Sequence, residues 1–211
     1  MEDSSSAILN TDNSISSKET AINTSPNFEV NNPISPYLQK QIIKSITLNL
    51  KDIIKENIKN KQTKLIKYDL FYIGKLPPIS IEDYINRIFK NTKMNMSTLI
   101  ISVIYIDRFC ELNGYILSFK NIHRLILAAC LLSIKFNEDI SVSTKYYADI
   151  AGISVYELNN LEFYLIVKLQ FSLFVDYDIY QKYFEYFCKY NIKENYKPEN
   201  SNNTDKIKKD I

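Results

Sequence analysis

The chain has 211 residues and a formal net charge of +2 at pH 7, and hydrophobic residues make up 45% of it. These values fit one globular domain with tails, and a charge so close to zero argues against a general nucleic-acid-binding protein. The chain contains only 3 glycines and no tryptophan, which disfavours a many-turned β protein and a glycine-rich phosphate loop.

Polar segments are found at both ends of the chain. Residues 1–35 are rich in Ser, Asn and Thr, with more acidic than basic side chains, and residues 191–211 are again polar. Such segments cannot bury enough apolar surface to offset the entropy lost on folding. We therefore predict a disordered acidic tail over 1–35 and a polar C-terminal tail over 191–211.

The chain shows no pattern typical of a membrane or secreted protein. Its start lacks a basic segment followed by an apolar run, and its apolar runs are shorter than the roughly 20 residues needed to cross a bilayer. The odd number of cysteines, 3, is more typical of a reducing compartment. We expect a protein of the nucleus and/or cytoplasm with no membrane partner.

The residues that usually carry catalysis or bind metals are few and scattered. Cys110, Cys130 and Cys188 are too far apart for a zinc-ligand spacing. The single histidine, His123, is more easily explained as a half-buried group at a helix start than as part of a triad. No nucleophile elbow, Walker loop or kinase catalytic loop is present. We therefore expect no catalytic residue, no metal, no cofactor and no small-molecule substrate.

Apolar residues recur every three or four positions between the tails, which predicts helices throughout. Segment 36–66 contains one amphipathic helix and a linker. Ser80, Ser97 and Ser154 are predicted N-caps of later helices, the last with Glu157 in a capping box. Further helices are predicted over about 118–136, 146–151 and 179–190.

Two of these predicted helices, over 97–113 and about 118–136, are apolar around nearly their whole circumference, which is typical of central helices. No convincing alternating strand pattern appears. We predict an all-α fold, with a box of about five helices and an additional N-terminal helix.

Two charged residues stand among apolar neighbours. Lys135 comes just before Phe136 at the end of a long apolar run, and Glu162 follows Leu161 on the next long helix. Each side chain could simply turn to water, or the two together could mark a binding site in which charges orient a partner over apolar surface. Spacing alone leaves both interpretations open.

Several motifs resemble the cyclin box. They are YIDRF (105–109), LLSIKF (131–136) and LNNLEFYLIVKLQFSL (158–173). More narrowly, PPISIEDYINRIFK, NIHRLILAACLLSIKFNED and YYADIAGISVYELNNLE resemble the P-type and U-type cyclins, the phosphate-signalling branch with a single box. The resemblance covers about residues 67–190, which would be the cyclin box.

The resemblance implies a regulatory, activating subunit, not itself an enzyme, that binds the αC helix of a cyclin-dependent protein kinase. In cyclins, a lysine after the third box helix and a glutamate in the fifth bind the kinase, and these correspond to Lys135 and Glu162. The apolar contacts of that groove carry over to Leu132, Phe136, Ile166, Phe171 and Leu173.

One departure from the family pattern concerns Asp107 of YIDRF. Mitotic cyclins pair this aspartate with an arginine of the first box helix, and the corresponding position here is Pro78. A buried carboxylate without a partner is costly. We therefore expect a structural salt bridge between Asp107 and Arg124.

Two alternatives stay open at this point. A cyclin-fold transcription factor that binds DNA would need a basic face and normally has two boxes. A cyclin-fold scaffold without kinase activation would be favoured if Lys135 and Glu162 pointed to opposite faces.

Overall fold

The computed structural model describes residues 34–60, 69–139 and 143–195, with side chains described through Tyr190. Most of the predicted tails, and the linker over 61–66, lie outside these residues. The described helices are α1 (Pro36–Lys59), α2 (Ile81–Thr92), α3 (Met96–Asn113), α4 (Ile122–Asn137), α5 (Thr144–Ala151), α6 (Val155–Lys168) and α7 (Tyr177–Asn195). No strand occurs in the described ranges, so the predicted all-α fold is confirmed.

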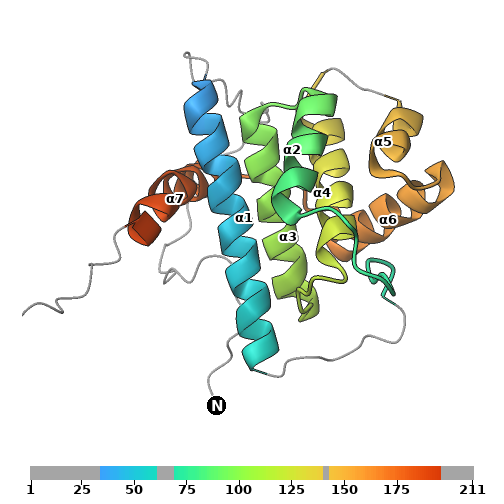
Figure 1. The fold of residues 1–211 in the computed structure, drawn as a ribbon. Helices are drawn as coiled ribbons and strands as arrows, with labels where there is room; N and C mark the ends of the chain where they lie inside the picture. Colours follow the sequence, from blue (N-terminus) through green and yellow to red (C-terminus); the bar gives the residue numbers. More distant parts are fainter. Residues whose placement is uncertain (1–33, 61–68, 140–142, 196–211) are drawn as a thin grey trace, which may run out of the picture.

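Helices α3 and α4 form the centre of the molecule, as their all-round apolar sequences predict. They pack against each other, while α7 covers α3 and α6 covers α4. Figure 1 shows α1 and α7 on one side of this central pair and α5 and α6 on the other. Tyr105 and Phe109 of α3 and Leu131 of α4 are almost completely buried.

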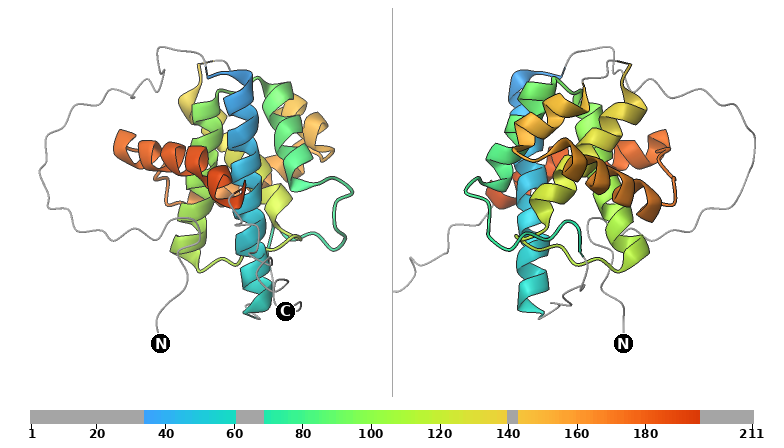
Figure 2. Two further views of the ribbon diagram at one scale, coloured as in Figure 1. Left: turned by 60° about the vertical axis from the view of Figure 1, so that its left-hand side comes forward. Right: turned by 90° about the vertical axis from the view of Figure 1, so that its right-hand side faces the viewer.

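The N-terminal helix α1 is part of the same hydrophobic core as the box. Ile42, Ile46 and Leu50 of α1 are fully buried in it. Helix α7 packs on α1 and crosses it instead of running alongside it (Figure 2). The Tyr190 hydroxyl adds a hydrogen bond of 3.1 Å to the carboxylate of Asp52, so the C-terminal helix fastens α1 to the box.

Most helix ends follow the predicted signals. The Ser80 hydroxyl accepts a hydrogen bond of 3.1 Å from the N–H of Asp83 at the start of α2. Gly114 and Gly152 end α3 and α5 with φ of +54° and +71°. Glycine adopts this left-handed conformation without a Cβ clash, so these two residues stop their helices where the sequence predicts.

Several boundaries differ from the predictions, and α5 and α7 each begin two residues earlier than expected. Ser97 lies inside α3, which begins one residue before it. Helix α4 begins at Ile122 and not near Ser118, because the Asn121 side chain accepts a 2.8 Å hydrogen bond from the Ser118 N–H and closes a turn there. Helix α7 continues to Asn195, past the expected end of the box at 190.

None of the described helices is both long enough and apolar enough to cross a membrane.

Candidate partner-binding surface

An ion pair joins the last turn of α4 to the middle of α6. Lys135 Nζ lies 2.7 Å from Glu162 Oε2, and the side chains are 37% and 15% exposed. The pair therefore lies at the rim of the surface and not inside the core. The two charges point toward each other, whereas the scaffold alternative predicts that they point to opposite faces.

The pair keeps a capacity for further hydrogen bonds. An ammonium group has three N–H donors and a carboxylate has about four lone-pair sites, so one mutual contact leaves several of each unused. Because Lys135 and Glu162 hold each other in place, a partner would meet a fixed donor next to a fixed acceptor. Such preorganisation reduces the entropy lost on binding.

The apolar residues expected around this pair divide into two groups. Phe136 and Phe171 are 51% and 65% exposed, and Ile166 is half-buried against the core. Leu132 and Leu173 are buried, with 4% and 7% exposure. The first group can touch a partner, while Leu132 and Leu173 support the surface from the core.

Sequence reasoning missed other exposed apolar residues on the same part of the chain. Phe163 and Val167 of α6 are 68% and 41% exposed, and Phe174 in the following loop is 53% exposed. The helical period could have predicted that Phe163 and Val167 are exposed, because these positions lie on the side of α6 opposite its buried stripe of Leu158 and Leu165.

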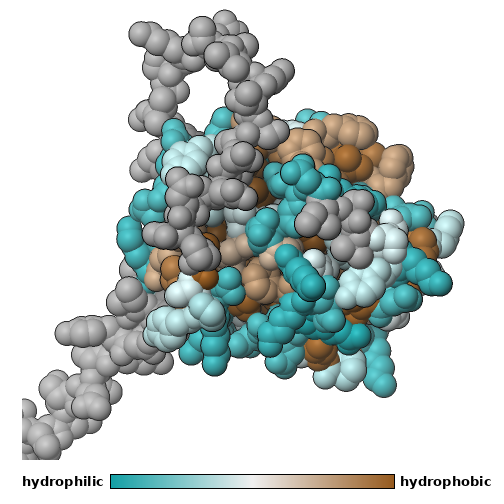
Figure 3. Space-filling view, turned by 90° about the horizontal axis from the view of Figure 1, so that it is seen from above, coloured by the Kyte–Doolittle hydropathy of each residue, from teal (hydrophilic) through white to brown (hydrophobic). Residues whose placement is uncertain are grey.

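Seen from above, the molecule shows apolar residues at its upper right edge and further apolar patches between hydrophilic residues on the same face (Figure 3). Contiguous exposed apolar residues are typical of interaction sites. We use the term "partner surface" for the ion pair and the exposed or half-buried apolar residues of the expected groove: Lys135, Phe136, Glu162, Ile166 and Phe171.

The turn after α6 has an unusual backbone. Gln170 and Phe171 have φ of +54° and +58°, a left-handed conformation that costs a residue with a Cβ roughly 1–2 kcal/mol. The Phe171 N–H donates a hydrogen bond of 3.0 Å to the carbonyl of Ile166. Two such residues in succession persist only where other contacts determine the backbone.

Those other contacts come from α3. The Tyr105 hydroxyl donates a hydrogen bond of 2.7 Å to the carbonyl of Leu173. The Arg108 guanidinium donates to the carbonyls of Ser172 at 2.5 Å and Phe174 at 3.3 Å. Both residues belong to YIDRF, so this motif fastens the turn that carries Phe171.

The comparisons with known proteins agree with this architecture. A protein-family model described as Cyclin matches residues 3–179. The chain belongs to the cyclin family. Members of this family are regulators of protein kinases and not themselves catalysts, which agrees with the predicted class.

The curated proteins to which the chain is similar include P-type and U-type cyclins of plants. The chain is 33% identical to Cyclin-U2-1 of Arabidopsis thaliana over 118 residues, which is 56% of this chain and 53% of that protein. It is 28% identical to Cyclin-P3-1 of Oryza sativa subsp. japonica over 151 residues, covering 71% and 59%. It is 40% identical to Cyclin-U3-1 of Arabidopsis thaliana over 104 residues, covering 49% and 47%. The chain therefore spans about half the length of Cyclin-U2-1 and of Cyclin-U3-1.

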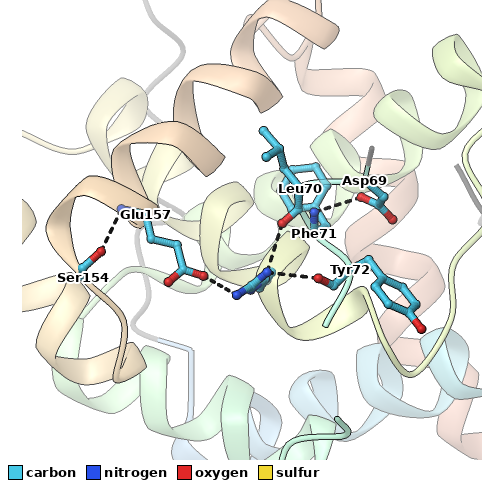
Figure 4. Close-up of polar contacts among 7 residues, drawn as sticks. Asp69, Leu70, Phe71, Tyr72, Ser154 and Glu157 are labelled. Carbon is cyan, nitrogen blue, oxygen red and sulfur yellow. Dashed lines mark hydrogen bonds and ion pairs between the residues drawn. The ribbon is translucent and has the colours of Figure 1, made fainter. Parts of the chain in front are cut away.

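The predicted ion pair between Asp107 and Arg124 is wrong. The Arg124 guanidinium pairs with the carboxylate of Glu157 and donates to the carbonyls of Leu70 at 3.2 Å and Tyr72 at 3.0 Å (Figure 4). Arg124 lies in the first turn of α4, where the start of α6 passes close to it. The nearest carboxylate is therefore that of α6, and Asp107 of α3 faces a different helix.

Asp107 is directed toward α7. It accepts a hydrogen bond of 2.5 Å from the Tyr183 hydroxyl. Burial and the neighbouring Asp107 carboxylate raise the pKa of Tyr183, so this hydroxyl stays protonated and can donate. In this cyclin, Tyr105, Asp107 and Arg108 of YIDRF all contact the chain that follows α6.

Arg124 instead holds the segment before α2 against the box. This segment contains Phe71, which is fully buried and packs its ring edge-on against Phe109 and Tyr164, with centroid distances of 5.5 and 5.6 Å. Glu157 completes only half of the predicted capping box. Its N–H donates to the Ser154 hydroxyl at 3.1 Å, while its carboxylate is used by Arg124.

Two titratable residues outside the partner surface, Cys130 and His123, are buried. Burial raises the pKa of the Cys130 thiol to about 12, so it is not a reactive thiolate at neutral pH. Burial lowers the pKa of His123, whose Nε2 lies 3.1 Å from the carbonyl of Ile79. Among the residues that the structure describes, no group of three or more His, Cys, Asp or Glu side chains could hold a metal ion.

Proposed function

We propose that this cyclin is the regulatory, activating subunit of a cyclin-dependent protein kinase and that it binds the αC helix of the kinase. The observation that carries the proposal is the Lys135–Glu162 pair, 2.7 Å apart, with exposed Phe136 next to Lys135 in the chain and exposed Phe171 in the turn after α6. We expect the protein to act in the nucleus and/or cytoplasm without binding a nucleic acid, a membrane or a small-molecule substrate.

An amphipathic helix is the partner that suits this surface. Its apolar side chains would cover Phe136, Ile166 and Phe171, as helix-in-groove recognition requires. The polar groups of the helix and its flanks would bond to the unused donors of Lys135 and the unused acceptors of Glu162. Charge-assisted hydrogen bonds of this kind are stronger than neutral ones and fix the register of a partner.

The proposed activation needs no chemistry from the cyclin. A protein kinase is active when its β3 lysine pairs with the αC glutamate, which requires αC to turn inward. A cyclin that binds only the inward αC shifts this equilibrium by its difference in affinity for the two states. A shift from 1:99 to 99:1 needs roughly 5.5 kcal/mol, which an interface of standard size with an apolar centre can supply.

A pull-down from the cells that make the protein tests the proposal. The full chain, Lys135→Ala and Glu162→Ala are each immobilised, and retained proteins are identified by mass spectrometry and assayed for protein kinase activity. We expect the wild-type chain to retain an active cyclin-dependent kinase. Each variant should retain about tenfold less, because it leaves the opposite charge unpaired at the interface.

The chain supplies a matched control. Lys189 and Glu185 of α7 form another surface ion pair, at 3.2 Å, and lie outside the partner surface. Lys189→Ala and Glu185→Ala should retain as much kinase as the wild-type chain. Equal retention by all five proteins would exclude Lys135 and Glu162 from the interface, and retention of no kinase by the wild type would refute the proposed function.

A further inference from the structure

The ring of Phe171 is placed by the backbone and not by packing. The residue is 65% exposed, so few contacts within the chain fix the direction of its side chain. The backbone that directs it is left-handed at both Gln170 and Phe171, with φ of +54° and +58°. Residues with a Cβ avoid this region. The N–H groups of Gln170 and Phe171 bond to the carbonyls of Val167 and Ile166 at 2.9 and 3.0 Å, and contacts from outside the turn add to these bonds.

Arg108 supplies such contacts from α3. Its guanidinium donates to the carbonyl of Ser172 at 2.5 Å and, through two nitrogens, to the carbonyl of Phe174 at 3.3 Å each. These carbonyls lie one and three residues after Phe171. A planar guanidinium that binds both of them fixes the direction of the chain as it leaves the turn, because its donors have a rigid fork geometry.

A different residue, Tyr105, attaches the loop after α6 to the core, so Arg108 is not needed for that attachment. The Tyr105 hydroxyl donates to the carbonyl of Leu173 at 2.7 Å, and Leu173 is itself buried in the core. The loop after α6 therefore stays attached to α3 without Arg108. Arg108 in addition fixes the backbone of three exposed residues: Phe171 and Ser172, which come before Leu173, and Phe174, which follows it.

We propose that Arg108 is a positioning residue for the partner surface: its guanidinium keeps the turn after α6 left-handed and thereby presents Phe171 to the kinase. This inference rests on the proposed function, because it assigns to Arg108 an effect on kinase binding. Arg108 does not itself touch the partner, and it acts through the backbone of residues 170–174.

The test compares three variants of the full chain: Arg108→Ala, Arg108→Ala with Gln170→Gly, and Arg108→Ala with Gln170→Ala. The probe is the kinase catalytic subunit that the wild-type chain retains, purified alone, and the readout is its dissociation constant. We expect Arg108→Ala to weaken binding about tenfold. Adding Gln170→Gly should restore it to within about threefold, because glycine adopts the left-handed region freely.

Gln170→Ala is the matched control for that rescue. Alanine keeps the Cβ clash that glycine lacks, so it should leave the tenfold loss in place. Arg87→Ala, which removes another arginine from the exposed side of α2, should leave the dissociation constant unchanged.

Hydrogen exchange of the free chain gives a readout that needs no kinase. Backbone amides of residues 170–174 should exchange faster in Arg108→Ala than in the wild type, and the Gln170→Gly double variant should return toward the wild-type rate. Unchanged exchange in Arg108→Ala would overturn the inference.

The two possible failures look different in the binding experiment. If the wild-type chain binds the kinase and Arg108→Ala binds it equally well, only the role of Arg108 is overturned. The same holds if Gln170→Gly and Gln170→Ala behave alike. If the wild-type chain binds no kinase, the proposed function is overturned and the role of Arg108 with it.

Discussion

His123, the single histidine of the chain, is buried at the start of α4. Its ring packs against Tyr84 with centroids 5.2 Å apart, and its Nδ1 has no hydrogen-bond partner among the described residues. Burial lowers the pKa of the imidazole, and the hydrogen bond to the Ile79 carbonyl opposes this only in part. The residue therefore serves packing in its neutral form.

This burial predicts a pH dependence of stability. Unfolded chains bind the proton with a histidine pKa near 6.5, whereas the folded protein binds it less readily, so acid favours the unfolded state. The free energy of unfolding should fall as the pH drops from about 7 to about 5, and His123→Gln should lack this part of the fall. Urea denaturation across this range measures both proteins. Parallel curves for wild type and variant would contradict the prediction.

At the scale of elements, α6 is joined to α4 by two ion pairs with different surroundings. Glu157 meets Arg124 at the start of α4, and Glu162 meets Lys135 at its end. Arg124 also donates hydrogen bonds to two backbone carbonyls. Lys135, in contrast, is followed in the chain by Phe136, which is exposed. The first pair therefore holds the fold, and we assign the second to the partner surface.

Removing each ion pair should have a different effect on the free energy of unfolding. Arg124→Ala should lower the free energy of unfolding by about 1–2 kcal/mol, because it leaves two carbonyls and a carboxylate without a donor. Lys135→Ala should lower it by less than about 1 kcal/mol, as is usual for partly exposed pairs. Urea denaturation gives these values, and the wild-type chain is the reference. A larger loss for Lys135→Ala than for Arg124→Ala would reverse the assignment.

At the scale of the whole molecule, one core joins α1, the box and α7, and its surface carries nearly balanced charge. The chain has 26 basic and 24 acidic residues. Binding to a DNA backbone depends on several lysine or arginine contacts that release counterions. A nearly neutral protein is better suited to another protein as partner.

This charge balance predicts the outcome for the transcription-factor alternative. In an electrophoretic mobility assay with a fluorescent DNA duplex at ~150 mM salt, the full chain should produce no shifted band at micromolar concentration. A basic DNA-binding domain run alongside gives the positive reference. A salt-sensitive shift by this chain would favour the DNA-binding alternative over the kinase partner.

Much of the fold follows from the sequence, because helices are local structures. The apolar period predicts each helix, and serines and glycines mark several of their ends. The sequence also singled out Lys135 and Glu162, since both interrupt apolar runs, but it did not predict that they pair with each other. The predicted helix starts at Ser97 and Ser118 are wrong, because the choice between neighbouring polar caps depends on small differences in local hydrogen bonding.

Only the tertiary structure decided which charges meet and which apolar side chains are exposed. Arg124 pairs with Glu157 and not with Asp107 because the crossing of α4 and α6, which no local pattern encodes, brings the start of one helix to the start of the other. The same packing buries Leu132 and exposes Phe163. A sequence period shows which side of a helix is apolar, whereas the neighbour on that side is set by how all the helices pack together.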